Sequence, residues 1–285
     1  MKQLKQVMKI ILPLAAAGLF LMQGAYLLLD SRLRVEYIDM RLFYVVNCII
    51  IICLAGTALL LFRATKIRLP IVLALTISLI TFQMVMMVKQ SGHIHQITDF
   101  SPDWKHTLVL KEDEDTGKTT YYRTAFGILA RAQDELPYET KKDFQVKWLD
   151  HDIAAVTYKA KDDTIHQYIG TYGSRDNDLS YSYVSASMYG QWSGENTHIT
   201  SGPDGITIKE DGRTETYEAR KAVQFGTTAI VLLKDGEAAW TIALNQNFLS
   251  HSNDPEPPEG NITLYKATMT DNEPILLNYA GEVPY

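Results

Sequence analysis

Three long apolar segments without a charged residue constrain this chain more than any other feature of its sequence. They cover residues 10–29, 42–62 and 69–88. Each matches the ~20 apolar residues that are needed to cross the hydrocarbon core of a bilayer. Soluble helices of this length keep a polar face, and these segments have none. The sequence therefore predicts a three-helix transmembrane anchor over residues 1–88.

The first segment has a second interpretation, as a cleaved signal peptide. Three lysines precede it, and the small residues Ala15–Ala17 lie within it, which is the order found in signal sequences. The apolar run nevertheless continues to Leu29, and two further spans follow. We therefore expect this segment to be retained as a membrane-spanning helix.

The charge of the chain is divided unevenly between its two parts. Residues 1–88 hold nine Lys and Arg and three acids, a net charge of +6, whereas residues 89–285 hold 18 Lys and Arg and 30 acids, a net charge of −12. Proteins that bind nucleic acid need a basic surface to neutralise phosphates. The acidic C-terminal part therefore predicts no nucleic-acid partner, and the lipid bilayer is the first partner that we expect.

The distribution of Lys and Arg around the spans predicts the side on which each part lies. With the N-terminus in the cytoplasm, six basic residues face the cytoplasm and five face the other side. The purely basic turn at 63–68 favours this orientation, because the first loop, 30–41, also carries three acids. Three spans then place the C-terminal domain outside the cytoplasm. We expect a multi-pass protein of the cell membrane with an extracytoplasmic domain, and a cytoplasmic domain is the alternative.

Cysteine usage fits this placement. Both cysteines, Cys48 and Cys53, lie in the second span, and residues 89–285 contain none. An exported domain without thiols avoids unwanted disulfides, although it also lacks disulfides as a source of stability.

Beyond a juxtamembrane linker at 89–105, residues 106–285 have the pattern of antiparallel β-structure. Short runs rich in β-branched and aromatic residues alternate with turn signals. Two of these turns are Asp-Gly pairs, at 211–212 and 235–236, which favour tight hairpins because both central residues take positive φ. The predicted strand pairs are 107–111 with 119–123, 153–158 with 165–172, 206–209 with 214–217, 229–233 with 238–244, and 262–269 with 275–279.

The expected fold class is therefore a membrane-anchored α part followed by an all-β soluble domain. One short helix is predicted near 126–135, before Leu136-Pro137. An antiparallel sandwich, a β-meander and a partial propeller all remain possible for the strands.

One motif recurs within this region. Asp-Phe followed by Trp four residues later occurs at 99–104 and again at 143–148, an offset of 44 residues that is typical of propeller blades. The sequence Phe-Ser-Pro-Asp at 100–103 resembles the turn before an inner strand in the WD40-like blades of TolB-type β-propellers. Those blades favour Gly at the next position, where this chain has Trp104. The resemblance covers residues 99–173 and implies a propeller-like arrangement there.

The richest candidate ligand surface is a run of aromatic residues in the second half of the chain. If 180–189 is a strand, its alternation puts Tyr181, Tyr183 and Tyr189 on one face. Such rings can stack on the sugars of envelope carbohydrate, although we favour ordinary cross-strand packing. The candidate surface comprises Tyr172, Asp176, Asp178, Tyr181, Tyr183, Tyr189 and Trp192.

Metal-binding patterns are incomplete. Asp-x-Asp pairs occur at 113/115, 150/152 and 176/178, but none continues as an EF-hand loop. His93 and His95 supply only two of the ligands of a zinc site. We expect no metal and no cofactor.

Catalytic signatures are also missing from the sequence. It contains no G-x-S-x-G, P-loop, H-E-x-x-H or S-x-x-K motif. No charged residue marks an ion path in the spans, and Asn47 and Gln83 are expected to hydrogen-bond between helices. The leading hypothesis is a non-enzymatic membrane-anchored binding, sensing or accessory protein that docks with another membrane protein. The alternatives are a surface carbohydrate-active enzyme with a carboxylate pair, and a scaffold facing the cytoplasm.

Overall fold

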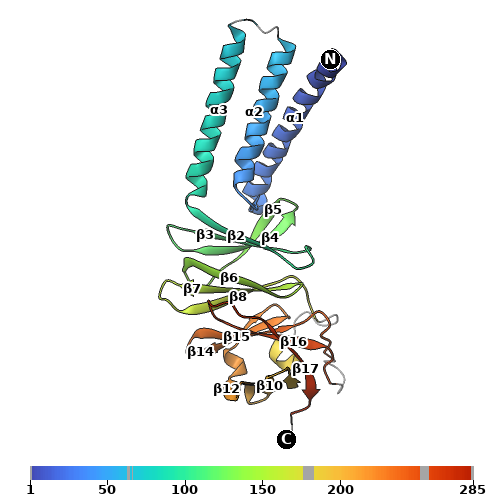
Figure 1. Ribbon diagram of the computed structural model, residues 1–285, viewed down its shortest axis with the longest axis vertical. Helices are drawn as coiled ribbons and strands as arrows, with labels where there is room; N and C mark the ends of the chain where they lie inside the picture. The colour runs from blue at the N-terminus through green and yellow to red at the C-terminus, as the bar shows by residue number, and fades with distance from the viewer. Residues whose placement is uncertain (1, 63–64, 66, 176–182, 251–256, 284–285) are drawn as a thin grey trace. The chain divides into compact units, whose positions relative to one another are not determined.

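The computed structural model confirms three long apolar helices followed by a β-rich region (Figure 1). It describes all residues except 1, 63–64, 66, 176–182, 251–256 and 284–285. The helices are α1 (Lys2–Leu33), α2 (Arg41–Leu61) and α3 (Arg68–Ser91). Each is long and apolar enough to cross a membrane. The chain divides into two compact units, which are residues 1–97 with 109–135, and residues 98–108 with 136–285.

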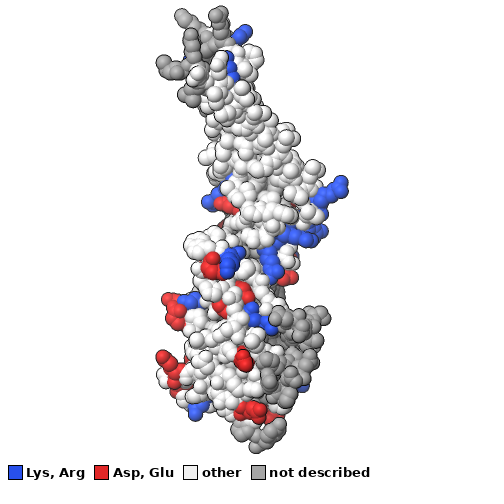
Figure 2. Space-filling view, turned by 90° about the vertical axis from the view of Figure 1, so that its right-hand side faces the viewer, with Lys and Arg blue, Asp and Glu red and all other residues white. Residues whose placement is uncertain are grey.

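In the first unit, α2 packs against both α1 and α3 (Figure 1). The face of α1 toward α2 buries Ala16, Gln23 and Tyr26. The outer faces of the three helices expose apolar side chains, and Figure 2 shows them as a white surface with basic side chains near the helix ends. An apolar surface of this extent is the surface that a bilayer would cover.

Polar side chains link the three helices. Gln23 Nε2 donates to Asn47 Oδ1 at 3.0 Å, and Asn47 Nδ2 donates to Gln83 Oε1 at 3.5 Å. The predicted interhelical hydrogen bonds are therefore present. Tyr37, which follows α1, donates its hydroxyl to Gln23 Oε1 at 2.9 Å. This chain of bonds connects the helices to the structure beyond their ends.

A five-stranded sheet in the order β1-β5-β4-β3-β2 lies mostly in the first unit, and only the end of β2 and the start of β3, within residues 98–108, belong to the second. Its strands are β1 (Val35–Tyr37), β2 (Ile94–Phe100), β3 (Thr107–Asp113), β4 (Thr119–Phe126) and β5 (Leu129–Glu135). Strand β1 comes from the loop between α1 and α2 and pairs with β5. A buried lysine secures it, because Lys111 Nζ donates to Glu36 Oε2 at 2.9 Å and to the Tyr37 carbonyl at 2.8 Å.

The short helix predicted near 126–135 is wrong, because this segment is the strand β5. Gly127 takes a φ of +60° and reverses the chain directly after β4. The following residues then pair with β4 on one side and with β1 on the other, and Ala130 is fully buried. Pairing on both sides of β5 thus overrides the weak local preference for helix.

The second unit is dominated by a nine-stranded antiparallel sheet that curls into a half-barrel, in the order β12-β11-β10-β9-β17-β16-β15-β14-β13. Its strands are β9 (Gly190–Ser193), β10 (Thr197–Gly202), β11 (Gly205–Glu210), β12 (Arg213–Tyr217), β13 (Val223–Phe225), β14 (Ala229–Lys234), β15 (Glu237–Leu244), β16 (Asn261–Lys266) and β17 (Ile275–Gly281). Across the curl, Lys234 Nζ of β14 lies 2.6 Å from Glu215 Oε1 of β12. This ion pair lowers the pKa of the Glu215 carboxyl to about 2.

A three-stranded sheet of β6 (Thr140–Asp150), β7 (Ile153–Ala160) and β8 (Ile165–Thr171) packs on this half-barrel. One core fills the inside of the curl and includes Met188, Trp192, Ile199, Ile206, Leu232, Ile242, Phe248 and Leu264. A second core lies between the two sheets and includes Ile153, Ala155, Ile169, Val231, Ala243 and Tyr265. The outcome is an antiparallel layered arrangement of the sandwich type.

The predicted hairpins are confirmed. Strands β7 and β8, β11 and β12, β14 and β15, and β16 and β17 pair antiparallel, and β3 lies beside β4. Both Asp-Gly turns take the expected positive φ, with 48° and 79° at Asp211 and Gly212 and 54° and 90° at Asp235 and Gly236. These φ values are those of the tight turns that suit the twist of the flanking strands.

The propeller-like alternative is wrong for the strands that the structure describes. They form sheets of five, three and nine strands instead of four-stranded blades. The two copies of the repeated motif also differ in structure, since 99–104 is the end of β2 and a turn, whereas 143–148 lies within β6. One local feature of the blade turn is retained, because Trp104 takes a φ of +61° at the position where the blades favour Gly.

Candidate ligand-binding surface

The aromatic run at 180–189 is not the strand that its alternation predicts. Residues Val184–Ser187 form the short helix α4, and β9 begins only at Gly190. The reason is packing, because Val184 and Met188 are one helical turn apart and both are fully buried in the core of the half-barrel. Asp176, Asp178 and Tyr181 lie outside the described residues.

Two of the predicted surface residues, Tyr183 and Tyr189, are exposed, with 66% and 48% of their surface accessible. Trp192 is instead fully buried. Its indole Nε1 donates to the Met188 carbonyl at 2.9 Å, and its ring lies 5.3 Å from that of Tyr279, edge to face. Trp192 therefore belongs to the core and cannot offer a ring to a ligand.

Tyr172 belongs to a different aromatic cluster. Its ring stacks on His106, with centroids 4.7 Å apart, and on Trp148, at 5.7 Å. Its hydroxyl donates to the Thr107 carbonyl at 3.0 Å. These contacts fix the connection between β2 and β3 against β6 and β8, which is the cross-strand packing favoured for these aromatic residues.

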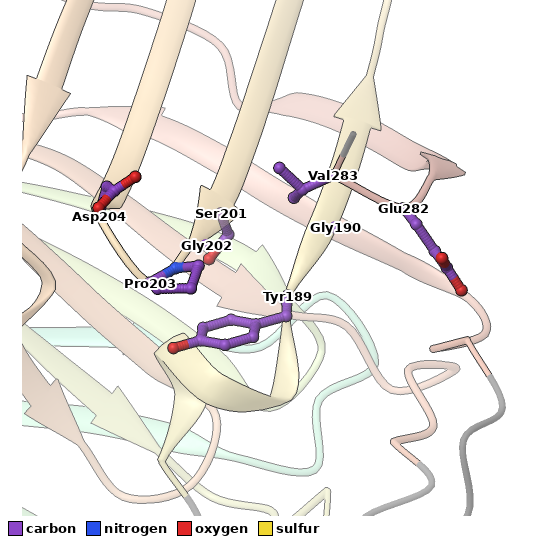
Figure 3. A pocket seen from close by; sticks show the side chains of 8 residues that line it. All are labelled: Tyr189, Gly190, Ser201, Gly202, Pro203, Asp204, Glu282 and Val283. Carbon is purple, nitrogen blue, oxygen red and sulfur yellow. The ribbon is translucent and has the colours of Figure 1, made fainter. Parts of the chain in front are cut away.

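A pocket of about 460 Å³ opens beside Tyr189 at one end of the half-barrel (Figure 3). Its walls come from three places in the chain. Tyr189 precedes β9, residues 201–204 are the end of β10 and its turn into β11, and Glu282 and Val283 follow β17. Antiparallel pairing of β9 with both β10 and β17 brings these three segments together.

Two glycines allow the backbone to form this pocket. Gly190 has a φ of +135°, and a Cβ there would meet the Tyr279 ring and the Gly281 carbonyl. Gly205 has a φ of +124°, and a Cβ there would meet the Tyr217 carbonyl. Both positions therefore require glycine for conformation as well as for space.

The pocket combines an aromatic ring with hydrogen-bond acceptors. Figure 3 shows the Tyr189 ring beneath the turn that contains Pro203, with Asp204 and Glu282 at opposite ends and not pointing toward one another. Burial and the negative charge of Glu282 raise the pKa of Tyr279 beneath Gly190. A ring that offers one face, beside carboxylate and carbonyl oxygens, suits a ligand that has both an apolar face and hydroxyl groups.

A second exposed aromatic pair lies in the turn between β2 and β3. The rings of Phe100 and Trp104 stack with centroids 5.3 Å apart, and Trp104 is 76% exposed. The Ser101 hydroxyl donates to Asp103 Oδ1 at 2.7 Å, and this bond lowers the pKa of the Asp103 carboxyl. The sequence comparison treated these residues as a blade turn and did not predict that their rings are exposed. The feature that could have indicated it is Trp104, a bulky residue at the position where the blade turn favours Gly.

The acid pairs that the structure describes have structural partners. Asp113 Oδ1 accepts the backbone N–H groups of Asp115 and Thr116 within its own hairpin turn, which lowers the pKa of Asp113. Asp152 forms a two-pronged ion pair with Arg175. Among the described residues, no group of three or more His, Cys, Asp and Glu is arranged to hold a metal ion.

His93 and His95 likewise contact carboxylates. His93 Nδ1 lies 3.0 Å from Asp115 Oδ2, and His95 Nδ1 lies 3.1 Å from Glu112 Oε2. The two imidazoles thus attach the start of β2 to β3 and to the turn that follows it.

Comparisons of this chain with protein-family models, with curated proteins and with solved structures find no match. No family model and no solved structure therefore supports the resemblance of residues 99–173 to propeller blades. Function is inferred from the residues themselves.

Proposed function

We propose that this chain is a non-enzymatic, membrane-anchored binding protein whose β-rich part lies outside the cytoplasm and binds envelope carbohydrate in the Tyr189 pocket. The observation that carries the proposal is the half-exposed Tyr189 ring, which forms one wall of a 460 Å³ pocket beside Asp204 and the turn at 201–204. Sugar rings present an apolar face to such a ring and hydroxyl groups to such acceptors. Three apolar helices in the same chain would anchor the protein that carries this pocket in the membrane.

The way in which the anchor is built supports an accessory or sensing role beside another membrane protein. Strand β1 belongs to the loop between α1 and α2, yet it is hydrogen-bonded into the five-stranded sheet. Glu36 and Tyr37 of this loop hold the buried Lys111 ammonium, and Tyr37 also reaches Gln23 in α1. A partner that moved the helices would therefore also move this sheet, which a flexible tether would not allow.

Replacing Tyr189 by alanine is expected to weaken carbohydrate binding about 3- to 10-fold, because a stacked aromatic contact contributes roughly 0.5–1.5 kcal/mol. The measurement is binding of the purified full-length protein in detergent to an array of envelope glycans, followed by titration of each glycan that binds. Tyr183→Ala is the matched control, because Tyr183 is more exposed and does not line the pocket. Equal losses in the two variants would contradict the assignment of the pocket.

The same samples distinguish the second candidate function, a carbohydrate-active enzyme. Asp204 and Glu282 are the carboxylates of the pocket, and they lie at its opposite ends (Figure 3). Release of sugar by the wild-type protein, abolished in Asp204→Asn or Glu282→Gln, would favour the enzyme over the binding protein. Binding without release favours our proposal.

The sidedness of the proposal is tested by cysteine labelling. In a variant with Cys48 and Cys53 replaced by alanine, Ser174→Cys is expected to react with an impermeant maleimide in intact cells. Thr65→Cys is expected to react only after the cells are permeabilised, because it lies in the turn between α2 and α3. Both native positions are exposed. The opposite pattern would support the alternative of a scaffold that faces the cytoplasm.

A further inference from the structure

The hairpin formed by β4 and β5 exposes apolar side chains at its tip. Phe126 is 62% exposed and Ile128 is 48% exposed, and Gly127 reverses the chain between them. The hairpin belongs wholly to the first unit, which also contains the three apolar helices. Neighbouring large apolar side chains that are exposed together are a feature of surfaces that contact a membrane or another protein.

The backbone of this tip is bonded to the residues that lead into α2. The Ile38 N–H donates to the Ile128 carbonyl at 2.9 Å, and α2 begins three residues later, at Arg41. Residues 42–62 carry no charge, so the polar start of α2 marks the boundary of the hydrocarbon core if this helix spans a membrane as proposed above. The tip of the hairpin then lies at the level of the lipid headgroups.

The register of the sheet shows which face of the hairpin is turned toward the helices. Tyr37 of β1 pairs with Leu129, and Val35 pairs with Arg131. Directly opposed residues, and residues two apart in a strand, lie on the same face of a sheet. Tyr37 packs on Tyr26 of α1, with ring centroids 4.3 Å apart. The face that carries Arg131 is therefore the face toward the apolar helices.

Basic side chains gather near this face. Arg131 is exposed and lies directly opposite Arg123 of β4. Arg32 in the last turn of α1 and Arg34 directly after that helix are also exposed. In the part of the chain that the structure describes, the guanidinium groups of Arg32, Arg34 and Arg131 have no ion-pair partner. The two acids of β5, at 134–135, pair with the start of β4, at the end of the hairpin away from its tip.

We propose that the tip of the β4–β5 hairpin and the arginines beside it form a membrane-binding surface in addition to the helices, which takes the phosphate groups of anionic phospholipids. Phe126 and Ile128 enter the boundary between headgroups and acyl chains, where aromatic and apolar side chains are stabilised. The Arg131 guanidinium binds a lipid phosphate through two parallel hydrogen bonds. A lipid surface accounts for both parts of this patch, whereas a free anion would contact only the arginines. This inference rests on the proposed membrane anchorage and is independent of the carbohydrate pocket.

The test places a fluorescent probe at the tip and quenchers in the lipid. Full-length protein with Cys48 and Cys53 replaced by alanine, and with Ile128→Cys labelled with the fluorophore NBD, is reconstituted into phosphatidylcholine vesicles. The vesicles are titrated with phosphatidylglycerol or phosphatidylcholine that carries a nitroxide on its acyl chain close to the headgroup. We expect both nitroxide lipids to quench the probe. Half-maximal quenching should need about fivefold less phosphatidylglycerol than phosphatidylcholine, or less still, because each basic side chain near the surface contributes about 1 kcal/mol toward anionic lipid.

Two variants test the two parts of the surface separately. Arg131→Gln should lower the preference for phosphatidylglycerol about fivefold, which is the contribution of one basic side chain, and Arg131→Lys should retain most of it. Phe126→Ser should weaken quenching by both lipids to a similar degree, because the tip loses an apolar side chain. Arg68→Gln is the matched control, because it removes the same charge at the start of α3, at the opposite end of the helices, and should leave the preference unchanged.

A probe that is quenched by iodide in the water and by neither lipid would overturn the inference and would leave the tip as a contact for another protein. Equal quenching by the two lipids, or a preference that is unchanged in Arg131→Gln, would also overturn it. Extraction of the vesicles with alkaline carbonate separates these failures from failure of the anchor. Protein that stays in the membrane with an unquenched tip contradicts only this surface, whereas protein that is released contradicts the anchor as well. Because Arg131→Gln and Phe126→Ser alter different strands, misfolding of one variant, detected by circular dichroism, leaves the other as the test.

Discussion

Replacing Trp192 by alanine is expected to lower the free energy of unfolding of the second unit by about 3–5 kcal/mol, the range for removal of a large buried ring. Trp192 is fully buried inside the half-barrel, where it packs against Phe248 and Tyr279 with ring centroids 5.9 Å and 5.3 Å away. Its removal would open a cavity between β9, β10 and β17 and leave the Met188 carbonyl without its indole donor. Both losses act on strands β9, β10 and β17, which position the walls of the Tyr189 pocket.

The measurement is urea-induced unfolding of the full-length protein in detergent, followed by far-UV circular dichroism in the β-sheet region. Trp192→Phe retains much of the volume and should cost less than the alanine variant. Trp104→Ala is the control, because this ring is exposed and surface substitutions usually change stability by less than about 0.5 kcal/mol. An unfolding midpoint of Trp192→Ala that equals that of Trp104→Ala would contradict the core position.

The features that could be predicted from the sequence are those that local chemistry determines. An uncharged apolar segment of bilayer length can satisfy its backbone hydrogen bonds in a membrane almost only as a helix, so the three helices can be predicted from composition alone. The Asp-Gly pairs at 211–212 and 235–236 fix tight turns because few other residue pairs tolerate their φ values. In each case the residues that decide the structure are adjacent in the chain.

The features that could not be predicted depend on partners far along the chain. Strand β1 has only three residues, and its existence depends on pairing with β5, about a hundred residues away. The segment Val184–Ser187 alternates like a strand but forms a helical turn, because Val184 and Met188 both enter a core built by later strands. Single-sequence patterns carry no signal for either event.

In the candidate site, too, one residue could be predicted from the sequence and its partners could not. Tyr189 was selected from the alternation of tyrosines at 180–189, but its partners in the pocket are the end of β10 with its turn, 201–204, and the residues after β17. Only the order β10-β9-β17 in the sheet makes these segments neighbours. Trp192 looks equivalent to Tyr189 in the sequence, and only burial inside the half-barrel separates their roles.

Replacing Asp152 by alanine is expected to destabilise the second unit by about 3–5 kcal/mol, because it leaves the Arg175 guanidinium buried without its main counterion. The Asp152 and Arg175 side chains are 6% and 5% exposed, and their two hydrogen bonds measure 2.7 and 2.8 Å. Arg175 Nε also donates to the Leu244 and Asn245 carbonyls at the end of β15. The pair therefore joins the start of β7 to the half-barrel.

A double variant separates the cost of an orphaned charge from a loss of packing. Asp152→Ala with Arg175→Met removes both charges and should recover much of the lost stability, since a buried ion pair contributes little net free energy over apolar replacements. The control is Asp163→Asn, which keeps a residue type that tolerates the φ of +71° at this position and removes only the surface ion pairs with Lys141 at 2.9 Å and Lys159 at 3.3 Å, so it should cost less than about 1 kcal/mol. Asp150 Oδ2 lies 3.9 Å from Arg175 and would compensate in part. If Asp152→Ala unfolds at the same urea concentration as Asp163→Asn, Asp150 is the effective counterion, and the stabilising role belongs to that residue instead.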